Sequence, residues 1–81
     1  MEEKIIIELC SKTKGAICDI EIPLGITAIE LLQALNQALH LGIRTEKISD
    51  CFLTAENPTA LLRGNMKLSE YGLHDGSRIY I

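Results

Sequence analysis

Residues 67–81, KLSEYGLHDGSRIYI, give the most specific indication of the fold of this chain. Its beginning is too short and too interrupted for a full helix, so it predicts a single helical turn at about residues 68–72. Asp75 and Gly76 then form a turn signal, and residues 78–81 alternate in the way a strand does. We therefore expect a helical turn, a tight turn and a strand in immediate succession.

Two alternating segments near the N-terminus predict an antiparallel β-hairpin. Residues 4–10, KIIIELC, and residues 16–22, AICDIEI, are rich in β-branched side chains and alternate with a period of two. The polar stretch between them ends in Gly15 and supplies a turn. Pro23 is expected to end the second strand, because proline cannot donate a hydrogen bond to a ladder.

The next segment has the period of a helix. Apolar residues recur there at intervals of three and four, with glutamine and asparagine on the opposite face. Thr27 and Glu30 have the spacing of a capping box, in which each side chain accepts a hydrogen bond from the other residue's backbone N–H. We expect a helix over about residues 28–40, followed by Gly42 as a left-handed cap.

The segment between this helix and the C-terminal stretch predicts a loop and two short strands. Residues 44–50 are polar and suit a loop, and residues 51–55 suit a short strand. A turn over residues 56–59 leads to a second short strand at residues 60–63.

These elements indicate an α+β fold in one domain, residues 1–81. A sheet and a helix each have one apolar face, and they bury these faces most simply against each other. With the helix as a crossover, the first and last strands can lie side by side in parallel. The expected architecture is a mixed sheet of four to five strands packed on one helix, which is the β-grasp arrangement.

Length and composition exclude several classes of protein. The chain has 81 residues, 47% of them hydrophobic, which suits one small globular domain. It has 8 basic and 11 acidic residues, a net charge of −3 and no basic tract, so we expect no nucleic-acid partner. No apolar run reaches the roughly 18 residues of a membrane span, and the acidic N-terminus does not suit a signal peptide. We expect a cytoplasmic protein that does not insert into a membrane.

The cysteines and histidines indicate neither a metal site nor a catalytic centre. Cys10, Cys18 and Cys51 are irregularly spaced and form no C-x-x-C pair. Cys51 is a candidate nucleophile with His40 or His74 as its base, but the third residue that would orient the base is missing. A cysteine in a strand is more often a small buried hydrophobe. We expect no enzyme activity, no catalytic residue, no metal and no cofactor.

The sequence LSEYGL at residues 68–73, followed by Asp-Gly and a strand, resembles the ubiquitin-like β-grasp family. The resemblance implies a structural corner at Leu68 and Tyr71, in which the tyrosine hydroxyl holds the preceding loop. Within that family the chain is most similar to the YukD/EsaB group, small proteins that accompany the type VII (ESX-like) secretion machinery of Gram-positive bacteria. This implies an accessory or regulatory role. The implied partner is a cytoplasmic part of that machinery, which would recruit the protein to the inner face of the membrane, or a second copy of the chain.

The C-terminal residues bear on whether this chain is expected to be conjugated to other proteins. Conjugated ubiquitin-like proteins, and sulfur carriers of the same fold, need a flexible tail that ends in Gly-Gly. This sequence stops at Ile81, inside the last expected strand, so we expect a non-conjugated module that works by binding proteins. An alternative of another class is a non-catalytic β-grasp subunit of a soluble enzyme complex such as an oxygenase.

The outer face of the expected sheet offers a candidate binding patch. If Ile5, Ile7 and Leu9 face the helix, alternation turns Ile6 to the solvent, and likewise Ile17 and Tyr80 on adjacent strands. Exposed apolar clusters often mark interfaces, although single surface isoleucines are normal. The patch hypothesis places three charged residues at its rim: Glu8, Asp19 and Arg78.

Overall fold

The computed structural model describes residues 3–42 and 51–81, so the loop expected at residues 44–50 lies outside the described residues. The described elements, in chain order, are β1 (Lys4–Ser11), β2 (Gly15–Pro23), α1 (Ala28–Leu39), β3 (Leu53–Glu56), β4 (Ala60–Leu62), the 3₁₀ helix η2 (Leu68–Tyr71) and β5 (Arg78–Tyr80). This is the predicted order of hairpin, helix, two short strands, helical turn and strand.

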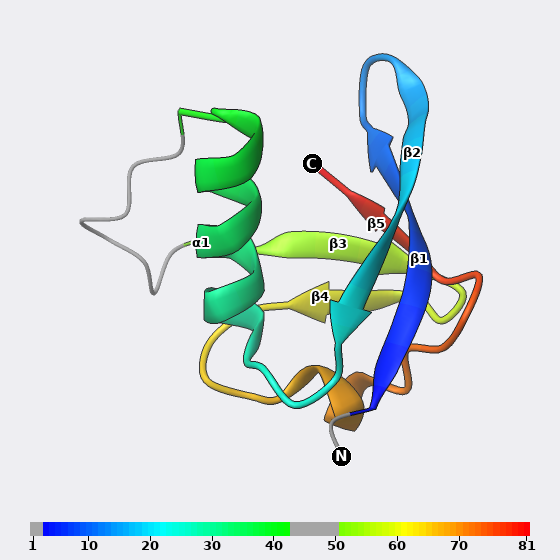
Figure 1. Cartoon of the computed structure of the whole chain (residues 1–81), viewed down its shortest axis with the longest axis vertical. Coiled ribbons are helices and arrows are strands. Elements are labelled where there is room, and N and C mark those ends of the chain that lie inside the picture. Colours follow the sequence, from blue (N-terminus) through cyan, green and yellow to red (C-terminus); the bar gives the residue numbers. More distant parts are fainter. Residues whose placement is uncertain (1–2, 43–50) are drawn as a thin grey trace.

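The strands form one five-stranded mixed sheet in the order β2-β1-β5-β3-β4. β1 and β5 are parallel, and the other neighbours are antiparallel. The first and last strands therefore lie side by side in the middle of the sheet, as the crossover argument predicts. α1 packs across one face of the sheet (Figure 1). The fold is the ubiquitin-like β-grasp expected from the sequence.

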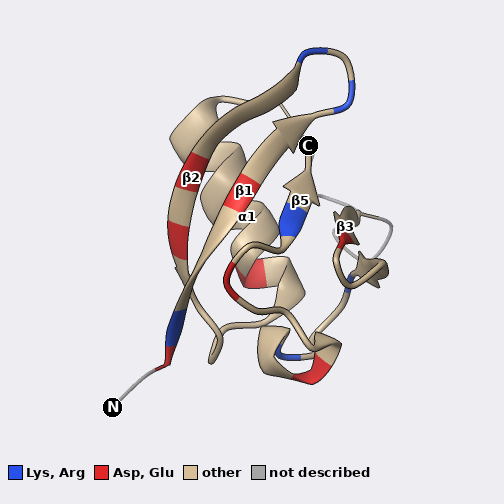
Figure 2. Cartoon of the chain, turned by 90° about the vertical axis from the view of Figure 1, so that its right-hand side faces the viewer, with Lys and Arg blue, Asp and Glu red and all other residues tan. Residues whose placement is uncertain are grey.

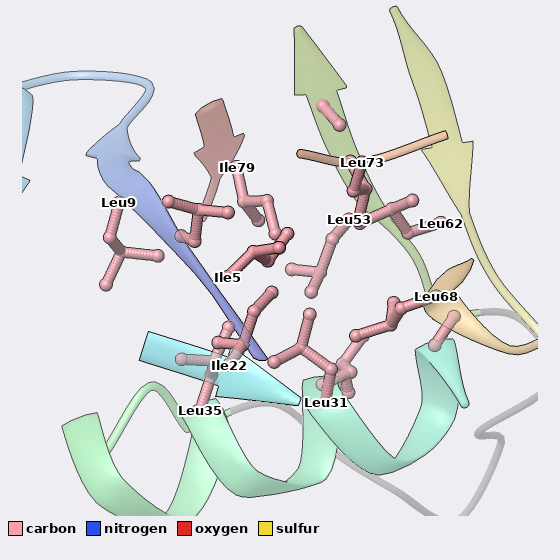
Figure 3. Packing of buried hydrophobic residues seen from close by; sticks show 14 of the residues in the cluster. Ile5, Leu9, Ile22, Leu31, Leu35, Leu53, Leu62, Leu68, Leu73 and Ile79 are labelled. Carbon is pink, nitrogen blue, oxygen red and sulfur yellow. The ribbon is translucent and has the colours of Figure 1, made fainter. Parts of the chain in front are cut away.

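The core fills the layer between α1 and the face of the sheet that α1 covers. Ile5 and Leu9 of β1 and Ile79 of β5 point into this layer, where they meet Leu31 and Leu35 of α1 (Figure 3). The other buried apolar residues of this cluster are Ile7, Ile22, Leu24, Ala28, Leu32, Leu53, Ala55, Leu62, Leu68 and Leu73. The apolar stripe of α1 and one face of the sheet thus cover each other, and no helix among the described residues covers the opposite face of the sheet.

The two ends of α1 differ in how well the sequence predicts them. At the N-terminus the capping box is confirmed: Glu30 N–H donates to the Thr27 hydroxyl at 3.2 Å, and Thr27 N–H donates to Glu30 Oε1 at 3.1 Å. At the C-terminus His40, not Gly42, is the left-handed cap, with φ 51°, and its N–H donates to the carbonyl of Asn36. The predicted position was wrong because histidine tolerates this conformation two residues before the glycine. Gly42 also has a positive φ, of 73°.

β2 ends at Pro23, as expected, with the proline as its last residue. Leu24 N–H donates to the Glu3 carbonyl at 2.9 Å, which marks a hydrogen-bonded pair next to the Lys4–Pro23 pair. Because such pairs alternate along an antiparallel ladder, Pro23 occupies a position that needs no donor toward β1. β3 starts at Leu53, two residues later than expected, and β4 ends at Leu62, one residue earlier.

Candidate protein-binding face

The face of the sheet turned away from α1 is the candidate site (Figure 2). We call it the outer face and assign to it, from strand register and burial, the side chains that alternate with the core residues. They are Lys4, Ile6, Glu8 and Cys10 of β1; Ile17, Asp19 and Glu21 of β2; Thr54 and Glu56 of β3; Leu61 of β4; and Arg78 and Tyr80 of β5.

A row of charged side chains crosses the middle of the outer face. Glu8 lies opposite Asp19 on one side and opposite Arg78 on the other, and Arg78 lies opposite Glu56. Arg78 Nε is 3.2 Å from Glu8 Oε1. The pKa of Arg78 is raised, first by its hydrogen bond with Tyr80 and then by the negative charge of Glu8, so the guanidinium stays charged.

A second, mostly apolar row lies next to the charged one. Cys10 pairs with Tyr80, Tyr80 with Thr54, and Thr54 with the exposed Leu61. Cys10 is buried although it lies on the outer face, and its Sγ is 3.5 Å from Glu8 Oε1. Burial raises the pKa of the Cys10 thiol above its ordinary value of 9.0, and the hydrogen bond to Glu8 raises it further. Cys10 is therefore a covered, protonated thiol.

Ile6 lies on the other side of the charged row, beside a shallow hollow of about 360 Å³. The lining residues are Ile6, Ile7, Glu8, Asp19, Asp75 and Gly76. Ile6 N–H donates to Asp75 Oδ1 at 2.8 Å, and Gly76 N–H donates to the Ile6 carbonyl at 3.0 Å. The loop before β5 thus forms one wall of the hollow. The sequence marked Asp75 and Gly76 only as a turn, because a contact over 69 residues leaves no local signal.

The register separates the residues of the hypothetical patch into two groups. Ile17 is the extra residue of a β-bulge, since Leu9 pairs with Cys18 and Cys10 with Ala16. Ile17 and Tyr80 therefore flank Cys10, whereas the charged row stands between Tyr80 and Ile6. Alternation along the single strands predicts one patch with Glu8, Asp19 and Arg78 at its rim. That geometry was wrong, because these charges run through the middle.

The corner at η2 has the contacts of a structural tyrosine. The Tyr71 hydroxyl donates to the Arg63 carbonyl at 2.8 Å and accepts from Arg63 N–H at 3.2 Å. Leu68 at the start of η2 is fully buried. Both backbone groups of Arg63, in the loop after β4, are thereby held by one side chain.

The cysteine and histidine residues have ordinary structural surroundings. His40 caps α1, Nδ1 of His74 lies 2.8 Å from the Asp75 carbonyl oxygen, and Cys51 packs against the core. No disulfide joins Cys10, Cys18 or Cys51, all of which lie in the described part of the chain. Across residues 3–42 and 51–81, no three His, Cys, Asp or Glu side chains are grouped as metal ligands. No helix among the described residues is long and apolar enough to cross a bilayer.

Comparison with protein families gives a match over almost the whole chain. The family model described as "WXG100 protein secretion system (Wss), protein YukD" matches residues 5–81. A search among curated protein sequences finds no match.

Three solved structures with the same fold are named as ubiquitin-like domains. The ubiquitin-like domain of tubulin-binding cofactor B has a TM-score of 0.71 at 20% identity, with 99% of this chain and 89% of that chain covered. The UBL domain of Plasmodium falciparum Dsk2 has a TM-score of 0.62 at 19% identity, covering 96% and 97%. The C-terminal ubiquitin-like domain of mouse tubulin-specific chaperone e has a TM-score of 0.69 at 11% identity, covering 98% and 84%. At these identities the likeness shows the fold alone.

Proposed function

Because the chain belongs to the YukD family of ubiquitin-like proteins, we propose that it is a binding component of a WXG100 (type VII) secretion system and docks proteins on its outer face. The family match over residues 5–81 is the observation that carries this proposal. The module is non-catalytic and acts by non-covalent contact. Its role is accessory or regulatory.

The exposed side chains of the outer face support this mode of action. Ile6 and Ile17 are 51% and 48% exposed, although they lie on the adjacent, paired strands β1 and β2 of the sheet. Their exposure is not needed for folding, because the core packs on the other face of the same strands. Apolar side chains held on a rigid sheet can be covered by a partner without rearrangement of the backbone.

The proposed partner is a cytoplasmic part of the membrane-embedded machinery. The protein would then work on the cytoplasmic side and reach the inner face of the membrane through that partner. Residues 1–81 act as one domain in this proposal, so that a single sheet face presents all the contacts.

Binding to purified cytoplasmic domains of the machinery, measured by titration calorimetry, tests the proposal. Ile6→Glu and Tyr80→Ala should each weaken binding at least tenfold while the melting temperature stays within a few degrees, because they change the exposed face and leave the core intact. Met66→Glu is the matched control, since Met66 is 43% exposed in the loop that meets the N-terminus of α1. Unchanged binding by both outer-face variants would contradict docking on this face.

The genes beside this one provide an independent test. Neighbouring genes for small helical secreted proteins and a membrane ATPase are expected. Neighbouring oxygenase subunits would instead indicate a subunit of a soluble enzyme complex.

A further inference from the structure

The outer face is acidic around the hollow, and this charge limits the kinds of protein segment that can bind there. We propose, on the basis of the proposed function, that the hollow receives a protein segment in which a lysine or arginine stands next to an apolar residue. The cationic group lies between Asp19 and Asp75, and the apolar neighbour covers Ile6.

The charge on the outer face and its adjoining loop supports a cationic occupant. The carboxylates outnumber the cations by five to two. The carboxylates are Glu8, Asp19, Glu21, Glu56 and Asp75, and the cations are Lys4 and Arg78. Red bands on β1, β2 and the loop before β5 lie to the left of the blue band on β5 (Figure 2). Such a field attracts basic segments and repels phosphates and anionic lipid headgroups.

Two of these carboxylates are available to a partner. Glu8 is paired with Arg78 at 3.2 Å, and Glu21 lies 3.8 Å from Lys4. Asp19 has neither an ion pair nor a hydrogen bond among the described residues. Asp75 uses Oδ1 for Ile6 N–H, which fixes the carboxylate in place and leaves Oδ2 open to a second donor.

The apolar part of the occupant follows from Ile6. This side chain lines the same hollow as Asp19 and Asp75 and is 51% exposed. A lysine or arginine also has an apolar stem, which can cover Ile6 while its charged end reaches the carboxylates. The hollow therefore suits a mixed basic and apolar segment better than a purely charged one.

The basic side chains of this chain itself give the competing occupant. Lys12 and Lys14 stand at the tip of the β1–β2 hairpin, at the far end of the molecule from the loop before β5 (Figure 2). A hairpin tip inserted into the hollow of a second copy would be a head-to-tail contact, which does not close a dimer. The occupant is therefore a different protein, and docking of a second copy would contradict the proposal.

Titration of the ¹⁵N-labelled full chain with two synthetic peptides tests the recognition chemistry. One peptide alternates leucine with lysine, and its control alternates leucine with glutamate. The lysine peptide should shift the amides of Ile6, Asp19 and Gly76 in a saturable manner, and the glutamate peptide should not. Shifts spread over acidic residues away from the face, such as Glu30 and Glu70, would overturn the proposal.

Charge variants test the same site. Asp19→Asn combined with Asp75→Asn should weaken binding of the lysine peptide about tenfold, since two charge contacts are lost. Asparagine keeps a carbonyl oxygen for Ile6 N–H, so the fold is retained. Glu3→Gln removes one charge outside the hollow and should leave binding unchanged. Equal binding by the double variant and the unchanged chain would overturn the proposal.

The double variant also separates this inference from the proposed function. If a domain of the machinery binds the double variant as tightly as the unchanged chain, the hollow is not its site, while the proposed function stands. If none of those domains binds the unchanged chain, the proposed function fails. Binding of the lysine peptide then still tests whether the hollow recognises a basic and apolar segment. Self-association of the chain that Lys12→Glu abolishes would show a second copy as occupant and overturn the proposal.

Discussion

Asp75 Oδ1 accepts a hydrogen bond of 2.8 Å from the backbone N–H of Ile6, 69 residues earlier in the chain. Gly76 N–H donates to the Ile6 carbonyl at 3.0 Å, and Glu8 N–H donates to the Ser77 carbonyl at 2.9 Å. Together these three hydrogen bonds extend the contact between β1 and β5 beyond their paired residues. The loop before β5 is thereby aligned along β1, with a side chain acting as one of the acceptors.

Asp75→Ala should lower the free energy of unfolding by about 1 kcal/mol, because Ile6 N–H loses its acceptor at a site open to water. Asp75→Asn should cost less than half of that, since its amide oxygen replaces Oδ1. Urea denaturation of both variants measures the difference. Equal losses in the two would show that charge, and not the hydrogen bond, matters at this position.

Tyr71→Phe should lower the free energy of unfolding by about 1 kcal/mol. The hydroxyl serves both the N–H and the carbonyl of Arg63, and these groups can partly turn to water when it is removed. Tyr80→Phe is the matched control, because the Tyr80 hydroxyl faces the side chains of Glu56 and Arg78 instead of backbone groups. A thermal melt in which both variants behave alike would argue against a structural role for the Tyr71 hydroxyl.

Ser77→Ala should be the most damaging of these changes, at about 2 kcal/mol. Ser77 is fully buried; its hydroxyl donates to the Asn57 carbonyl at 2.6 Å and accepts from His74 N–H at 3.0 Å. Its removal leaves the Asn57 carbonyl and the His74 N–H without this partner at a part-buried site. The exposed Ser69→Ala should change stability by under about 0.5 kcal/mol. Chemical denaturation of the two variants side by side checks the contrast.

The buried thiol of Cys10 should make the fold sensitive to alkaline pH. Its pKa is raised above the ordinary 9.0, mainly by burial, so the folded state holds the proton more tightly than the unfolded state. The stability it contributes is complete below pH 9.0 and is lost as the pH rises through the folded-state pKa. Denaturation curves between about pH 8 and about pH 10 should therefore show declining stability.

Cys10→Ala should flatten this decline, and the exposed Cys18→Ala should leave it as it is. If the slope is the same in both variants, another group is responsible. Tyr80 is the next to consider, because burial also raises its pKa above 10.0. Thiol alkylation followed by peptide mapping gives a second readout, in which Cys18 should react well before Cys10.

Local signals in the sequence account for most of the fold. The capping box of Thr27 and Glu30 and the three-and-four spacing of apolar residues are properties of neighbouring residues, and they located α1 to within one residue of its ends. The alternation of residues 4–10 and 78–81 likewise located the two central strands. What neighbouring residues determine, a single sequence can predict.

The candidate site was harder to predict, because it depends on register. One extra residue, Ile17, shifts the pairing of β2 against β1, and nothing in the local sequence distinguishes it from the residues around it. The hollow beside Ile6 depends on Asp75, which approaches only when β5 pairs with β1. Ile6, Ile17, Arg78 and Tyr80 were correctly expected on adjacent strands, but the charges between them follow from pairings that only the folded sheet fixes.

The central position of β5 has a consequence for synthesis on the ribosome. β5 lies between β1 and β3 in the sheet. While residues 78–80 are still inside the exit tunnel, the β1–β2 hairpin and the β3–β4 pair therefore lack the strand that connects them. The sheet can close only after those residues emerge, and until then the apolar faces of β1 and α1 have no complete layer to cover them. The sheet of this protein is thus completed only after translation has passed its last strand.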